Sequence, residues 1–273
     1  MSEGTPSATL SGKRIGVTAA RKADELIDLL RRRGAEVLHA PAIDYVDLAE
    51  DPQLRAATEQ VIAERTDLVV ITTGMGFRGW LDAARGAGLV DRLLEQLGSA
   101  TIYTRGPKAT GAVRAAGLRE RYSPASETDA ELLAELCAHP LRDKRCVIQA
   151  HGEPLGGFVE ELRGRGARVL QVLPYRWRRP DDPRPLRTLI AEVLAGRVDA
   201  LAFTSAPAVS TLLEVAIEDE QGEGFIEALR SKVLVACVGS VTAAPLARYD
   251  IPSIAPQRAR TAALVRTLTD ALA

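Results

Sequence analysis

Short apolar runs alternate along the chain with longer amphipathic stretches, a pattern typical of repeated strand–helix units. The apolar runs that predict strands are RIGVTA (14–19), DLVVITT (67–73), TIYT (101–104), RCVIQA (145–150), DALAFTS (199–205) and VLVACVG (233–239). Between them, segments such as KADELIDLLRRRG (22–34) carry leucines at helical spacing and end at a glycine. Strands that alternate with helices predict an α/β fold with parallel sheets.

Several segments of the chain have a counterpart elsewhere in it. The paired segments are 66–77 with 198–209 (TDLVVITTGMGF and VDALAFTSAPAV), 101–118 with 233–251, and 13–45 with 144–177. Each copy combines a strand–helix–strand unit with two strands that end at hydroxyl or glycine residues. We therefore expect two similar, doubly wound parallel-sheet lobes.

The order of the copies predicts how the lobes share the chain. The first lobe would be discontinuous, from residues 10–41 plus 182–273, and the second would span 50–171. Extended, proline-marked linkers at 42–49 and 172–181 would connect them. Two linkers of this kind predict a hinge, with a ligand cleft between the lobes.

Composition removes several classes of function. The formal net charge is −1, which excludes a generally basic nucleic-acid binder. No apolar run approaches the roughly 18 residues of a membrane helix, so we expect no membrane partner. The cysteines are too few and too scattered for a disulfide framework, so we expect a cytoplasmic protein. The chain has only 3 cysteines and 3 histidines, and none has metal-ligand spacing, so we expect no metal.

Candidate chemistry lies mainly at strand ends. GMGFRG (74–79) matches a dinucleotide-binding pattern, but Arg105 follows the next strand where an acidic residue is needed, and the repeated copy lacks the glycines. Hydroxyl residues at strand-to-helix junctions can cap the helices or help the helix N-termini bind anions. These residues are Thr73, Thr110, Ser205, Ser240 and Thr242.

The second linker carries aromatic and basic residues that allow two interpretations. Tyr175, Arg176 and Trp177 can form a solvated connector or contact a planar, acidic ligand. For His151 and Cys237 the sequence favours packing roles over catalysis.

Taken in order, these motifs resemble the uroporphyrinogen-III synthase family over about residues 10–272. The segments that carry the resemblance are LSGKRIGVTAAR, APAIDY, DLVVITT, GPKATGAVRAAGL, RVLQVLPYRW, DALAFTSAPAV, VACVGSVTAAPL and APQRARTAALVRTL. The resemblance implies a bilobal α/β fold, no cofactor, and a monomer that binds hydroxymethylbilane. Such an enzyme closes this linear tetrapyrrole into a ring with loss of water and inversion of the last pyrrole.

The resemblance also implies site residues. Tyr175 matches the family's cleft tyrosine and would donate a proton to the leaving hydroxyl or orient it. The expected substrate contacts are Thr18, Arg21, Thr73, Lys108, Thr110, Arg176, Ser205, Ser240 and Thr242.

This chain departs from the family pattern at several polar positions. The departures are Ala19, Ala20, Met75, Ala109 and His151, with Arg21 and Thr110 each displaced along the chain. Such drift is also expected of a catalytically lapsed, ligand-sensing domain of a transcriptional regulator, a variant of the same scaffold. A DNA-binding domain would then lie outside this chain, which by itself is not expected to bind nucleic acid.

Overall fold

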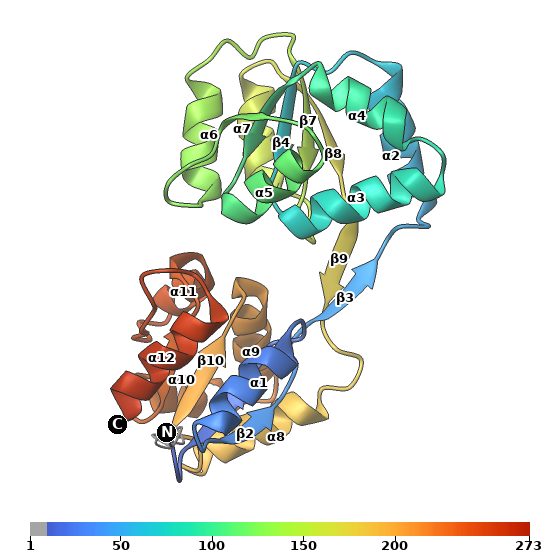
Figure 1. The fold of residues 1–273 in the computed structure, drawn as a ribbon. Helices are drawn as coiled ribbons and strands as arrows, with labels where there is room; N and C mark the ends of the chain where they lie inside the picture. Colours follow the sequence, from blue (N-terminus) through green and yellow to red (C-terminus); the bar gives the residue numbers. More distant parts are fainter. Residues whose placement is uncertain (1–9) are drawn as a thin grey trace, which may run out of the picture. The chain divides into compact units, whose positions relative to one another are not determined.

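The computed structural model describes residues 10–273 and divides into two compact units (Figure 1). Unit 1 contains the chain up to Asp44 together with Arg178–Ala273, and unit 2 contains Tyr45–Trp177. The chain therefore passes from one unit to the other twice. Both units are parallel α/β structures, which confirms the predicted fold class.

The sheet of unit 1 has the strand order β11-β10-β1-β2, and all its strands are parallel. The strands are β1 (Arg14–Val17), β2 (Glu36–His39), β10 (Ala200–Phe203) and β11 (Leu234–Cys237). Residues 200–203 are all buried because both faces of the sheet are covered. This burial explains why β10 is a continuous apolar run in the sequence.

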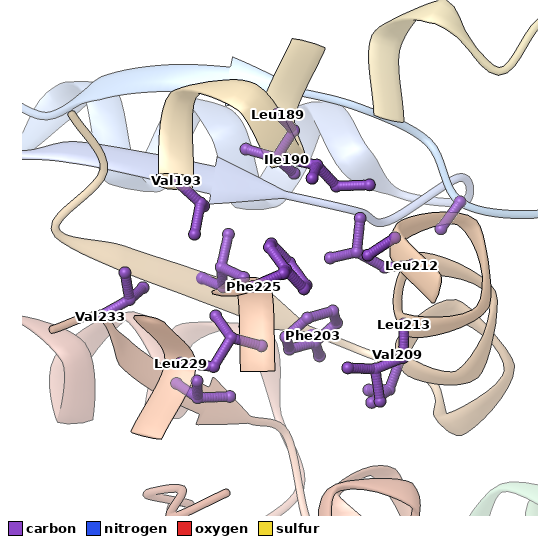
Figure 2. Close-up of a cluster of buried hydrophobic side chains, with 14 of the residues drawn as sticks. Leu189, Ile190, Val193, Phe203, Val209, Leu212, Leu213, Phe225, Leu229 and Val233 are labelled. Carbon is purple, nitrogen blue, oxygen red and sulfur yellow. The ribbon is translucent and has the colours of Figure 1, made fainter. Parts of the chain in front are cut away.

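Helices cover each face of this sheet (Figure 1). On one face, α1 (Ala23–Arg32) and α12 (Thr261–Leu272) pack over Ala200 and Ala202. On the other face the helices are α8 (Arg184–Leu194), α9 (Ala206–Glu218), α10 (Gly222–Ser231) and α11 (Ser240–Ala247). Figure 2 shows this second core, where Phe203 of β10 lies among Leu212 of α9 and Phe225 of α10.

The sheet of unit 2 has the order β6-β5-β4-β7-β8, again parallel throughout. The strands are β4 (Leu68–Ile71), β5 (Thr101–Thr104), β6 (Glu120–Tyr122), β7 (Arg145–Gln149) and β8 (Arg168–Val172). One face is covered by α2 (Pro52–Ala63), α3 (Gly74–Gly86), α4 (Val90–Gly98) and α5 (Pro107–Ala115), and the other by α6 (Asp129–Cys137) and α7 (Gly156–Gly164).

Three buried polar side chains, Trp80, Thr58 and Arg145, make hydrogen bonds in the interior of unit 2. The Trp80 indole donates to Thr58 Oγ1 over 2.9 Å, and Thr58 Oγ1 donates to the Leu54 carbonyl over 2.7 Å. Arg145, only 5% exposed, donates to the carbonyls of Gln60 and Glu64 over 2.7 and 2.6 Å. These carbonyls lie at the C-terminal end of α2, where such groups lack partners within the helix.

A separate two-stranded sheet is formed by β3 (Asp44–Asp47) and β9 (Tyr175–Arg178). In the described part of the chain, no helix has the length and apolar character needed to cross a membrane.

Candidate functional site

In both units the chain adds its first strands toward one edge of the sheet and its later strands toward the other edge. The strand order therefore reverses between two neighbouring strands of each sheet. This happens between β4 and β7 in unit 2 and between β1 and β10 in unit 1. Ligands of open α/β sheets bind outside the carboxyl ends of the strands at such a reversal. The residues just after these strands are therefore the candidates in each unit.

In unit 2, Thr73 follows β4 and caps helix α3. Its Oγ1 accepts from Gly76 N over 3.1 Å, and its own N–H donates to Gln149 Oε1 over 3.1 Å. Gln149, the last residue of β7, is completely buried. The predicted hydroxyl is thus engaged in capping, the first of the two roles that the sequence leaves open.

Close packing explains the first two glycines of GMGFRG, Gly74 and Gly76. A Cβ on Gly74 would lie 2.1 Å from the Lys108 carbonyl oxygen, and a Cβ on Gly76 would lie 2.2 Å from Gln149 Nε2. Only glycine lets α3 approach α5 and β7 this closely. These two glycines therefore have a structural cause that needs no dinucleotide.

Helix α5 begins directly after β5 and carries two of the predicted substrate contacts. Thr110 Oγ1 lies 2.7 Å from Thr104 Oγ1, so the two hydroxyls share a hydrogen bond. Lys108 is exposed on the first turn. The N-cap residue of α5 is Gly106, and no side chain caps the helix there.

A charged cluster that the sequence did not single out lies at the same edge of unit 2. Arg105 follows β5, His151 follows β7, and Asp129 is the first residue of α6. Arg105 Nη1 lies 3.5 Å from both Asp129 carboxylate oxygens and 3.4 and 3.5 Å from His151 Nδ1 and Nε2. Burial and the Arg105 guanidinium lower the pKa of His151 to about 4, although Asp129 acts in the opposite direction. His151 is therefore neutral near pH 7.

Strand β9 brings Tyr175 to the end of β7. Gly152, with a φ of +85°, accepts a hydrogen bond from Trp177 N over 3.3 Å. A Cβ on Gly152 would lie 2.2 Å from Trp177 Cδ1 and 3.1 Å from Tyr175 Cε2. The Tyr175 ring also packs against Tyr45, with ring centroids 5.9 Å apart. Tyr175 is half-buried and Arg176 is exposed, so the predicted tyrosine lies next to the His151–Gly152 turn.

In unit 1 the predicted contacts differ in exposure. Thr18 follows β1 and is completely buried, with a hydroxyl that has no hydrogen-bond partner among the described residues. Ser205 is the N-cap residue of α9, yet its side chain makes no capping hydrogen bond. On α11, Ser240 is exposed and Thr242 is 5% exposed. Arg21 is exposed in the loop after β1.

The structure thus groups the predicted residues by unit. Unit 2 holds Thr73, Lys108, Thr110, Tyr175 and Arg176, and unit 1 holds Thr18, Arg21, Ser205, Ser240 and Thr242. That the two groups share one cleft stays a prediction.

Two residues of the charged cluster differ in how far the sequence could have revealed them. Arg105 could have been found from its position, because it follows a strand as Thr73 and Ser205 do. Asp129 carried no comparable signal, because it lies inside an ordinary helix-start pattern.

Among residues 10–273, no cluster of acidic, histidine or cysteine side chains forms a metal site.

Known proteins match the chain over nearly its full length. It is 31% identical over 264 residues to a Bacillus subtilis protein named Uncharacterized protein YjjA, covering 94% of each chain. It is 26% identical over 235 residues to a Putative uroporphyrinogen-III synthase from Methanothermobacter thermautotrophicus, covering 86% of this chain and 88% of that one.

Solved structures also match the chain over nearly its full length. A mutant uroporphyrinogen III synthase from Thermus thermophilus superposes with a TM-score of 0.81 at 29% identity, covering 95% of this chain and 98% of that one. The family model described as Uroporphyrinogen-III synthase HemD matches residues 24–266. Because this match covers most of the chain, the chain belongs to the uroporphyrinogen-III synthase HemD family.

Proposed function

We propose that the protein is a uroporphyrinogen-III synthase that cyclises hydroxymethylbilane with loss of water and inversion of the last pyrrole. The observation that carries the proposal is the family match across residues 24–266. In this proposal the protein works in the cytoplasm as a monomer and uses no cofactor.

The carboxylates of the substrate need binding sites that do not depend on a large net charge. Helices α5, α9 and α11 each begin after the carboxyl end of a strand, and none has a side-chain cap. Their first N–H groups therefore have no partner within the helix and favour anions. Such helix starts would let a chain whose net charge is −1 bind the acetate and propionate arms of the substrate, which supports the proposal.

In the proposed chemistry, Tyr175 acts on the end of the substrate that loses its hydroxyl group. Its phenol would donate a proton to the departing hydroxyl, which leaves a cationic, conjugated pyrrole end. The rest of the protein would then hold the chain so that the inverted pyrrole attacks this cation, which is catalysis by orientation. Contact with Gly152 and with the Tyr45 ring supports this role, because both restrict how the Tyr175 ring can turn.

The test supplies freshly prepared hydroxymethylbilane to the purified protein and separates the product isomers after oxidation to porphyrins. We expect the type III isomer from the wild-type protein, and the type I isomer from the uncatalysed reaction. In Y175F we expect a rate about ten- to a hundredfold lower, since one charge-directed hydrogen bond is lost at the transition state.

Y249F is the matched control. Tyr249 is a half-buried tyrosine that follows the C-terminal end of α11, away from the carboxyl ends of the strands. We expect this variant to keep the wild-type rate. Type I product at the uncatalysed rate with wild-type protein would reject the enzyme, and tight tetrapyrrole binding in that case would indicate a ligand-sensing domain.

A further inference from the structure

The guanidinium of Arg105 is largely buried but has no close acceptor among the described residues. Its side chain is 20% exposed, and its nearest polar contacts are those at 3.4–3.5 Å to His151 and Asp129. Other shielded arginines are paired much more closely. Arg14 contacts carboxylates at 2.7 and 2.9 Å, and Arg145 donates to carbonyls at 2.6 and 2.7 Å. A guanidinium carries five donors, and leaving them poorly paired away from water is costly.

Arg105 engages neither ring nitrogen of His151 closely. Arg105 Nη1 is almost equally far from Nδ1 and Nε2, at 3.4 and 3.5 Å. An N–H group in line with one lone pair would be clearly closer to that nitrogen, so Nη1 lies over the ring face. Asp129 Oδ2 is 3.8 Å from Nε2, beyond hydrogen-bond distance. The imidazole edge can therefore donate one hydrogen bond to a further group.

Asp129 has a second source of stabilisation besides Arg105. It is the first residue of α6, where the helix dipole favours a negative charge, and Thr128 caps the same turn. Its carboxylate is 35% exposed and so remains partly hydrated. Loss of the contact with Arg105 would therefore destabilise the Asp129 carboxylate only slightly.

One more acidic side chain lies at this edge. Glu127, with a φ of 58°, places Cγ and Oε2 within 3.2 and 3.3 Å of the Cβ position of Gly106, at the start of α5. Asp129 and Glu127 thus lie beside the two features that favour an anion, the Arg105 guanidinium and the uncapped N-terminus of α5 respectively.

We propose that Arg105 and His151 form a carboxylate-binding subsite, and that the Asp129 carboxylate pairs with Arg105 until a carboxylate of the ligand replaces it. Under the proposed function, on which this inference rests, the ligand group is an acetate or propionate arm of a tetrapyrrole. Arg105 supplies two parallel N–H donors to that carboxylate, and His151 supplies one more. Tyr175, next to the His151–Gly152 turn, would then contact the same molecule.

The experiment measures the dissociation constant of uroporphyrin III, a stable octacarboxylate tetrapyrrole, by quenching of tryptophan fluorescence. We expect R105Q to bind about tenfold more weakly or worse, and R105K to be intermediate because it keeps the charge but loses the fork. We expect D129N to bind several-fold more tightly, since the internal competitor is removed. A purely structural role for the cluster would weaken binding in both R105Q and D129N.

R114Q and E120Q are the matched controls. Arg114 and Glu120 form an ion pair in the same unit, with Arg114 Nε 3.1 Å from both carboxylate oxygens. Arg114 lies on the last turn of α5, whereas Arg105 precedes the first. We expect both control variants to bind like wild type.

Three results would overturn the subsite: wild-type affinity in R105Q, weaker binding in D129N, or no binding of the porphyrin by the wild-type protein. The isomer assay is independent of this measurement. If R105Q and D129N change the affinity as expected but the wild-type protein forms no type III product, the proposed reaction is rejected and the subsite is kept. If type III product forms but R105Q binds the porphyrin like wild type, the subsite is rejected and the proposed reaction is kept.

Discussion

Replacing His151 with glutamine should make the protein more resistant to acid. In the wild-type protein the pKa of His151 falls from an ordinary value of 6.5 to about 4, chiefly through burial and next through Arg105. As pH drops below 6.5, the unfolded chain takes up a proton on this imidazole and the folded chain does not. Stability is therefore lost between pH 6.5 and about pH 4, and no further loss comes from this residue at lower pH.

The magnitude follows from the two pKa values. A full shift of this size corresponds to about 3 kcal/mol of unfolding free energy between pH 7 and pH 4. His151 is 23% exposed, and the carboxylate of Asp129 faces it from α6, so solvent screening reduces the expected loss to about 1–2 kcal/mol. H151Q carries no proton at any of these pH values and lacks this part of the acid destabilisation.

Urea unfolding of both proteins at pH 7, 5.5 and 4.5 measures the effect. The difference in unfolding free energy between H151Q and wild type should move in favour of the variant as pH falls. H139Q is the control, because His139 is 40% exposed and contacts Glu135, four residues before it on the chain. Parallel pH profiles for H151Q and wild type would refute the linkage argument.

Two further predictions concern packing in unit 2. G74A should cost about 1–3 kcal/mol of unfolding free energy in a denaturant titration, because its Cβ would lie 2.1 Å from the Lys108 carbonyl oxygen and a backbone atom cannot rotate away. G111A, a helical glycine with nothing within 4 Å of its Cβ position, should instead be neutral or stabilising, and equal effects would contradict the reasoning. T58V keeps the side-chain shape but leaves the buried Trp80 indole without its acceptor, so its unfolding free energy should fall by about 1–3 kcal/mol. A loss below about 0.5 kcal/mol would argue that water replaces the hydroxyl.

The fold was predictable because both sheets are covered on two faces. Runs such as RCVIQA and DALAFTS become β7 and β10, whose residues are entirely buried. Strand β6 escaped prediction because an edge strand of 3 residues, Glu120–Tyr122, has no apolar pattern. The roles of Thr73 and Gly74 could not be predicted from the sequence, since capping and ligand binding use the same residue types at the same junctions.

The candidate site was predictable only where strand ends marked it. Tyr175 lies on a strand that docks against Gly152, and this contact depends on a glycine with a positive φ that sequence spacing does not reveal. The sequence favoured a packing role for His151 because its charged neighbours, Arg105 and Asp129, are distant along the chain. Their meeting is a product of the strand order β5-β4-β7, which brings separate strand ends to one edge.

The pairing of the two central strands of unit 1 limits how early this unit can fold while the protein is being synthesised. Strand β1 pairs with β10, and Arg14 N donates to Asp199 Oδ2 over 2.8 Å across 185 residues of sequence. At about 5–20 residues per second, the ribosome delivers that partner roughly 10–40 s after β1. All strands of the unit 2 sheet lie within Tyr45–Trp177 and are complete before β10 emerges. The apolar residues of β1 and α1 must therefore wait, exposed or held by a chaperone, while a later-made sheet assembles. Slow translation between residues 177 and 200 would prolong the stage in which these apolar residues lack their partner strand.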